Sequence, residues 1–272
     1  MTFKIGGFAS GAGGKKEQPS ASCQLAAEAK PRKSLVQVCF PGKGMPLNYY
    51  NDQFDLKKGE FVYVDGKQEG LLGRVSEVSY NFKIKISDYR KVIAVVDTDV
   101  QGEFCMAGSH FVTFDPAAIP TNKIVTWFRA PAKESEVFVS STDDFSFRLD
   151  DLSGMNVNAA IADRGHDYYM DNRVRYLCID NGRGFAIVDG SDTYTVEFSY
   201  RGGEISQLIC DCPCGYTCKH EFAAMLQLRE TLEIINKHYC ESYERTGYFA
   251  AITKGALFTF AVDSKETGSF TL

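Results

Sequence analysis

The chain has 272 residues, 44% of them apolar and 24% charged, which is enough for two compact domains with the composition of a soluble globular protein. No segment approaches the ~18 apolar residues of a membrane helix, and the N-terminal residues lack a secretory apolar region, so we expect a cytoplasmic protein with no membrane partner. The net charge of −5 is uneven, because residues 1–91 carry 15 Lys and Arg against 9 Asp and Glu, and residues 92–272 carry 15 against 26.

The N-terminal stretch, residues 1–33, is expected to be a flexible tail. Residues 10–33 are rich in Gly, Ala, Ser, Lys and Pro and show no apolar period. The glycines before Lys15 do not complete a phosphate-binding loop, because that motif requires glycine where Ala9 stands and a hydroxyl group where Lys16 stands.

Residues 34–120 show strand patterning with Gly and Asp turns, which predicts a small β-barrel-like domain. Asp65-Gly66 is a hairpin turn signal. The continuous apolar run Val92–Val96 suits a strand that is buried on both faces. The predicted strands are Leu35–Val38, Phe61–Val64, Gly73–Val78, Phe82–Ile86 and Val92–Val96.

The order of aromatic, apolar and glycine positions in this domain resembles the small β-barrels of primosomal helicases and related bacterial proteins. The resemblance covers about thirty residues and is carried by Tyr49, Tyr50, Leu56, Gly59, Val62, Val64, Gly73 and Val75.

Residues 121–160 are interpreted as a connector with some strand content. The next segment, 161–240, is predicted to be a module of four strands and one amphipathic helix over Glu221–Lys237, where apolar residues recur at helical spacing without Gly or Pro. Residues 241–272 are expected to add strands. The complete fold prediction is α+β, mostly β. The strands predicted after residue 160 are Val174–Leu177, Phe185–Val188, Thr193–Phe198, Ile205–Ile209, Tyr248–Ile252, Leu257–Val262 and Ser269–Leu272.

The chemistry of the chain is concentrated between the fourth strand of this module and its helix. Four cysteines and a histidine follow one another in eleven residues, CDCPCGYTCKH. Crowded cysteines in a large chain with an odd total of nine indicate metal ligation by thiolates in a reducing compartment, and argue against a disulfide framework. The C-x-C pair leaves a strand, and the C-x-H pair opens a helix, where the dipole favours thiolate.

The spacing C-x-C, a short spacer and C-x-H at a helix start resembles the SWIM zinc-finger family. The resemblance spans residues 162–229 and implies one zinc ion held by Cys210, Cys212, Cys218 and His220. Upstream counterparts are Arg164, Gly165, Tyr168, Arg173, Val174, Val188, Gly190, Ser191, Tyr194 and Val196.

Cys214 leaves an alternative open at this site. It could replace Cys210 as the partner of Cys212, or remain a free thiol beside the metal; alignment with the SWIM pattern favours Cys210. A closed set of three thiolates and one imidazole leaves no position for a catalytic water, so the zinc is expected to be structural and the protein not an enzyme.

The SWIM resemblance implies a DNA-binding or protein-interacting protein. The basic first third is consistent with contact to DNA or RNA, and the acidic remainder argues against broad phosphate contact by the zinc module itself. The alternative is a protein–protein interaction adaptor, with Tyr49-Tyr50 and Tyr168-Tyr169 as candidate exposed aromatic pairs.

Overall fold

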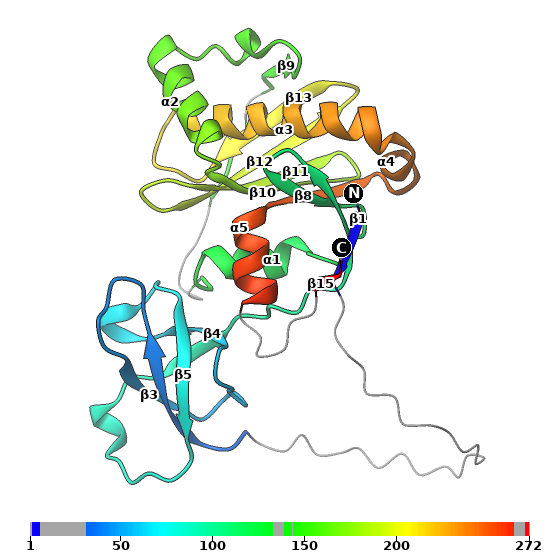
Figure 1. Ribbon diagram of the computed structural model, residues 1–272. Coiled ribbons are helices and arrows are strands. Elements are labelled where there is room, and N and C mark those ends of the chain that lie inside the picture. The colour runs from blue at the N-terminus through cyan, green and yellow to red at the C-terminus, as the bar shows by residue number, and fades with distance from the viewer. Residues whose placement is uncertain (1, 6–30, 133–138, 143, 264–269, 272) are drawn as a thin grey trace, which may run out of the picture. The chain divides into compact units, whose positions relative to one another are not determined.

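The computed structural model describes residues 2–5, 31–132, 139–142, 144–263 and 270–271 (Figure 1). The chain forms two compact units, residues 6–96 and residues 97–272 together with residues 1–5. Each unit is built on an antiparallel sheet, one of five strands and one of ten among the described residues. The structure therefore confirms the mixed α+β class with mostly β content.

The unit of residues 6–96 contains a five-stranded sheet in the order β3-β2-β5-β4-β6. Its apolar core is formed by side chains from all five strands and from Phe40 and Leu56. The strands are β2 (Ser34–Cys39), β3 (Leu47–Asn51), β4 (Phe61–Val64), β5 (Gly73–Ser79) and β6 (Val92–Val95), with single 3₁₀ turns η1 (Gly66–Gln68) and η2 (Ile86–Asp88).

The ladder of this sheet does not close into a barrel. Among the described residues, an isolated parallel bridge between Tyr50 and Lys91 links β3 with the start of β6. It includes a 2.8 Å hydrogen bond from the Tyr50 amide to the Arg90 carbonyl. The two edge strands therefore approach each other at one point, through backbone contact.

In this unit one strand prediction was wrong, and another was right about the strand but wrong about its burial. The alternating segment Phe82–Ile86 is irregular and leads into η2, because it pairs with no strand in the described sheet. The run Val92–Val96 forms β6, but as an edge strand in which Ile93 is 41% exposed. An apolar run alone does not distinguish an edge strand from a central one.

The ten-stranded sheet of the other unit has the order β15-β1-β7-β8-β14-β10-β11-β12-β13-β9. Its four consecutive strands from β10 to β13 form a meander that agrees with the predicted strands. The strands are β1 (Thr2–Ile5), β7 (Gly102–Ala107), β8 (His110–Thr113), β9 (Ser146–Arg148), β10 (Val174–Asp180), β11 (Arg183–Asp189), β12 (Thr193–Arg201), β13 (Glu204–Cys210), β14 (Tyr248–Thr253) and β15 (Phe270–Thr271).

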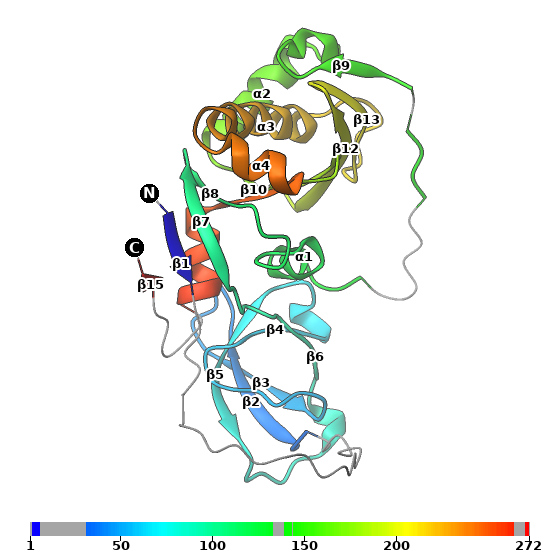
Figure 2. The ribbon, with the colours of Figure 1, turned by 90° about the vertical axis from the view of Figure 1, so that its right-hand side faces the viewer.

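Helices cover both faces of this sheet, with α3 on one face and α1 and α5 on the other (Figures 1 and 2). On the α3 face, Leu177 and Phe249 join the core with Leu228. On the opposite face Trp127 of α1 stacks on Phe260, with ring centroids 4.7 Å apart. The helices are α1 (Thr121–Phe128), α2 (Ala159–Met170), α3 (Lys219–His238), α4 (Cys240–Thr246) and α5 (Lys254–Leu257), with η3 (Leu152–Met155) and η4 (Phe258–Val262).

The observed boundary between the units, at residues 96 and 97, differs from the predicted domain end at residue 120. The strands β7 and β8 belong to the larger sheet because β8 pairs with β14, a strand about 140 residues later in the chain. For the same reason the predicted 161–240 module is part of a larger unit.

The terminal segments also differ from the predictions. Residues 2–5, assigned to a tail, form β1 against β7, while residues 6–30 lie outside the described part of the chain.

The predicted connector 121–160 contains α1, β9 and η3. The predicted strand Leu257–Val262 is the end of α5 followed by one π-helical turn, because Phe260 packs on Trp127 instead of entering a ladder. Tyr248–Ile252 is a strand as predicted.

Helix α2, which the sequence analysis did not identify, packs closely on the beginning of α3. Asn158 caps α2 by accepting a hydrogen bond from the Ile161 amide. Gly165 permits the close approach, since a Cβ atom there would lie 2.9 Å from Phe222 Cβ and 3.0 Å from the Lys219 carbonyl oxygen. The helix that bears His220 is thus in direct contact with α2.

We expect Gly165→Ala to lower the free energy of unfolding by ~1–3 kcal/mol, because the added methyl group overpacks the α2–α3 contact. Gly255→Ala is the matched control, since Gly255 is also helical and its added Cβ would meet nothing within 4 Å. That variant should be neutral or more stable by up to ~1 kcal/mol. Chemical denaturation of both variants measures the difference; equal stability would contradict the tight contact.

Candidate metal centre

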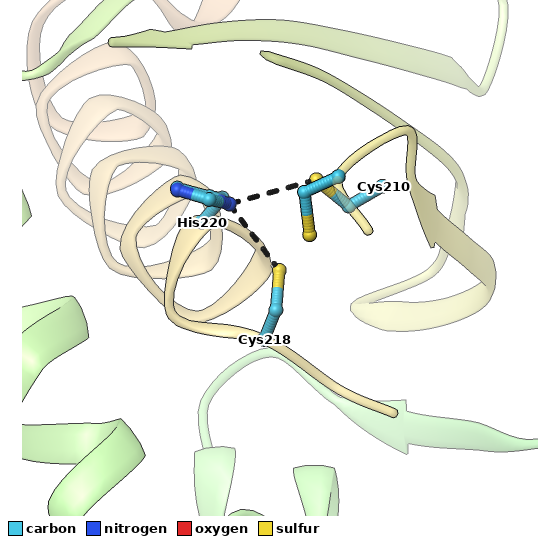
Figure 3. Close-up of side chains that lie close together, drawn as sticks. Cys210, Cys218 and His220 are labelled. Carbon is cyan, nitrogen blue, oxygen red and sulfur yellow. Dashed lines mark hydrogen bonds between the residues drawn. The ribbon is translucent and has the colours of Figure 1, made fainter. Parts of the chain in front are cut away.

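The strand-to-helix junction brings Cys210, Cys212, Cys218 and His220 together. Cys210 is the last residue of β13, Cys218 is the N-cap of α3, and His220 lies in the first turn of that helix. The four potential ligand atoms all lie within 4.8 Å of one another. Figure 3 shows one nitrogen of the His220 ring directed toward the sulfurs of Cys210 and Cys218.

The separations within the cluster fit a tetrahedral ion. His220 Nδ1 lies 3.6 Å from Cys218 Sγ and 3.8 Å from Cys210 Sγ. A zinc ion with bonds of ~2.3 Å to sulfur and ~2.0–2.1 Å to nitrogen would hold tetrahedral S and N ligands about 3.6 Å apart. The four side chains could therefore bind a metal ion, with Nδ1 as the nitrogen ligand.

The His220 ring is held in place by aromatic side chains. Tyr194 stacks on it with a centroid distance of 4.4 Å and an interplanar angle of 27°, and Tyr168 lies 5.5 Å away. Gly190 leaves room for the ring, because a Cβ atom there would lie 3.0 Å from His220 Nε2. All three residues precede the ligand pairs in the chain, and the structure places them beside the His220 ring.

The surroundings of the cluster shift the pKa values of three of its side chains toward their neutral forms. Burial lowers the pKa of His220 to about 4, so the ring is neutral at pH 7 and its nitrogen can act as a ligand. Burial raises the pKa of Cys212 to about 12, and the neighbouring Cys210 sulfur, together with burial, raises that of Cys218. Without a cation the buried thiols keep their protons, so metal binding would release them.

Glu221 joins the two halves of the ligand set, and sequence reasoning missed it. Its buried carboxylate accepts a 2.6 Å hydrogen bond from the Cys218 amide. Burial raises the pKa of Glu221, in opposition to the backbone groups of Cys218 and Cys210, which favour its charged form. The signal in the sequence was a capping box in which cysteine replaces the usual Ser or Thr three residues before Glu.

The first ligand pair is fixed through Asp211, and the loop that follows it is exposed. The carboxylate of Asp211, between Cys210 and Cys212, accepts a 2.8 Å hydrogen bond from the Thr195 amide and forms a 2.6 Å ion pair with Arg129, the C-cap residue of α1. Cys214 is exposed and is not one of the four clustered residues. The structure therefore groups Cys210, and not Cys214, with the other three predicted ligands.

Comparison with known proteins gives a partial relative without an assigned function. A protein of Methanocaldococcus jannaschii that is described as uncharacterized is 34% identical over 90 residues, which are 33% of this chain and 36% of the relative. The chain thus spans about a third of that protein's length. No family model and no solved structure matches the chain.

Glu221→Ala should weaken metal retention by ~10- to 100-fold, because it removes the carboxylate that holds the Cys218 amide in place. Titration with a chromophoric chelator measures this affinity. Glu233→Ala is the control, since Glu233 is exposed on the same helix. Unchanged affinity in the Glu221 variant would show that the carboxylate does not position the ligands.

Proposed function

We propose that Cys210, Cys212, Cys218 and His220 hold one structural zinc ion, and that the protein is a non-catalytic, SWIM-type nucleic-acid-binding protein. The observation that carries the zinc assignment is the cluster of three sulfurs and one imidazole nitrogen within 4.8 Å. Structural zinc sites use this ligand set in tetrahedral geometry. Four protein ligands fill the coordination shell, which leaves no position for a reacting water.

The proposed role of the ion is to fasten β13 to the beginning of α3. The two ligand pairs lie on either side of the loop 213–217, whose residues are exposed or half-buried. A metal ion that bridges the pairs contributes binding free energy to folding, because the unfolded chain has no preformed site. The backbone bonds of Glu221 support the same junction.

The proposal of a nucleic-acid ligand is supported by the charge of the five-stranded unit. Its described residues 31–96 carry eleven Lys and Arg against seven Asp and Glu, whereas residues 97–272 are strongly acidic. Affinity for phosphates is expected to come from the basic unit. DNA is the first candidate ligand, and RNA is the second.

A protein-interaction adaptor is the second candidate, and one observation favours it. Tyr216 is 69% exposed in the loop 213–217, and an exposed aromatic side chain suits a protein contact. The pair Tyr49 and Tyr50 gives no such support, since these side chains are only 5% and 3% exposed.

Among the described residues, no helix is long and apolar enough to cross a membrane.

Elemental analysis of the purified protein should find close to one zinc ion per chain. Cys218→Ser should lose the metal and lower the melting temperature, because a ligand is removed from a site that also stabilises folding. Cys214→Ser should keep both the metal and the stability, since its exposed thiol is outside the cluster. A fully folded wild-type protein without metal would contradict the zinc assignment.

Wild-type protein should bind nucleic acid at ~50 mM salt and lose affinity steeply as salt increases, because bound lysines and arginines release counterions. Retention on immobilised DNA and RNA over a salt series measures this. Absence of retention on both would contradict the nucleic-acid function. Partners that remain bound after nuclease treatment in a pull-down would favour the adaptor.

A further inference from the structure

The connection between β5 and β6 places basic and aromatic side chains together on the five-stranded unit. Residues 80–91 contain four basic residues and one acidic residue. Three of the basic side chains, Lys83, Lys85 and Arg90, are exposed. With Arg32, which contacts this segment, they define what we call the basic-aromatic surface: Arg32, Tyr80, Lys83, Lys85, Arg90 and Lys91.

Tyr80 supplies an exposed aromatic ring in this surface. Its side chain is 38% exposed, and the Arg32 guanidinium carbon lies 4.3 Å from the ring centroid. Both the ring and the guanidinium plane can stack on a nucleobase. The buried ring of Tyr50 lies nearby, with Lys91 Nζ 5.5 Å from its centroid and Phe82 in edge contact at 6.4 Å.

Backbone and side-chain contacts anchor the end of this segment. The Arg90 carbonyl accepts a hydrogen bond from the Tyr50 amide. The Lys91 carbonyl accepts a 2.9 Å hydrogen bond from the Asp65 amide. Lys91 also forms a 3.0 Å ion pair with Asp52. The stem of Arg90 lies over Gly66, where a Cβ atom would be 3.0 Å from Arg90 Cγ. The part of the surface at Arg90 and Lys91 is therefore held in place before a ligand arrives, which reduces the entropic cost of binding there.

Half of the net positive charge of residues 31–96 lies at this surface. These residues carry a net charge of +4, from eleven Lys and Arg and seven Asp and Glu. The surface contains five of the basic residues. Asp52 and Asp65 contact Lys91, and Asp88 lies in the same segment, which leaves a net charge of +2.

We infer that the basic-aromatic surface binds single-stranded nucleic acid, with the lysines and arginines on phosphates and Tyr80 stacked on a base. A single strand offers both its backbone and unpaired base faces, whereas a duplex hides those faces within its own stack. The inference rests on the proposed nucleic-acid function and specifies its site and its substrate class.

Fluorescence anisotropy of the full-length, zinc-loaded protein tests the inference. The probes are labelled poly(U) and poly(dT) of about 20 nucleotides and a mixed-sequence DNA duplex of the same length, at ~50 mM salt. Wild-type protein should bind the single strands more tightly than the duplex. Tyr80→Ala should weaken single-strand binding by at least about fivefold, and Tyr80→Phe, which keeps the ring, should bind like wild type.

The double variant Lys83→Ala/Lys85→Ala tests whether these lysines contact phosphates. It should weaken single-strand binding and reduce the slope of log affinity against log salt by about 1.4, because two phosphate contacts are lost. The matched control is Lys57→Ala/Lys58→Ala, which removes the same charge from two exposed lysines elsewhere in the unit. Circular dichroism checks that all variants are folded.

Two results would overturn this inference alone. One is tighter binding of the duplex than of either single strand. The other is single-strand binding that the Tyr80→Ala and Lys83→Ala/Lys85→Ala variants leave unchanged. Failure of wild-type protein to bind any of the three probes would overturn the nucleic-acid function as well.

Discussion

The tertiary constraint on which the candidate site depends is the turn from β13 into α3. The chain must leave the sheet at Cys210, the end of β13, and begin a helix at Lys219 on the face of the same sheet. The buried Glu221 carboxylate accepts a hydrogen bond from the Cys218 amide at the helix side of this turn. Because the buried face of α3 continues into the core with Leu228 and Ile235, the position of the ligands is coupled to the packing of the whole helix.

The surroundings of His220 illustrate how one ligand is specified by several weak constraints. Tyr194 fixes the plane of the ring, and Gly190 leaves the space that its outer nitrogen occupies. The Nε2 atom is buried and has no hydrogen-bond partner among the described residues, so Nδ1 is the nitrogen that meets polar atoms. This arrangement orients the ring toward the sulfurs before any ion is bound.

The two units differ more in net charge than in fold. Both are antiparallel sheets, but the basic excess lies in the five-stranded unit and the cysteine cluster lies in the acidic one. In the proposed division of roles, the metal ion stabilises a turn and the basic unit supplies contacts to phosphates. A metal site and a ligand-binding surface in one chain need not coincide, and the charge distribution here favours their separation.

The sequence by itself determined the features that depend on local pattern. The spacing of Cys210, Cys212, Cys218 and His220 was sufficient to predict the cluster, and alternating apolar residues were sufficient to predict β10 to β13. Only the tertiary structure decided which segments pair at long range. The strands β7 and β8 belong to the larger sheet because β8 pairs with β14. The segment Phe258–Val262 is helical, and its Phe260 packs on Trp127. Hydrogen bonds between distant strands and contacts between distant rings leave no periodic signal in the chain, so local patterning could not reveal them.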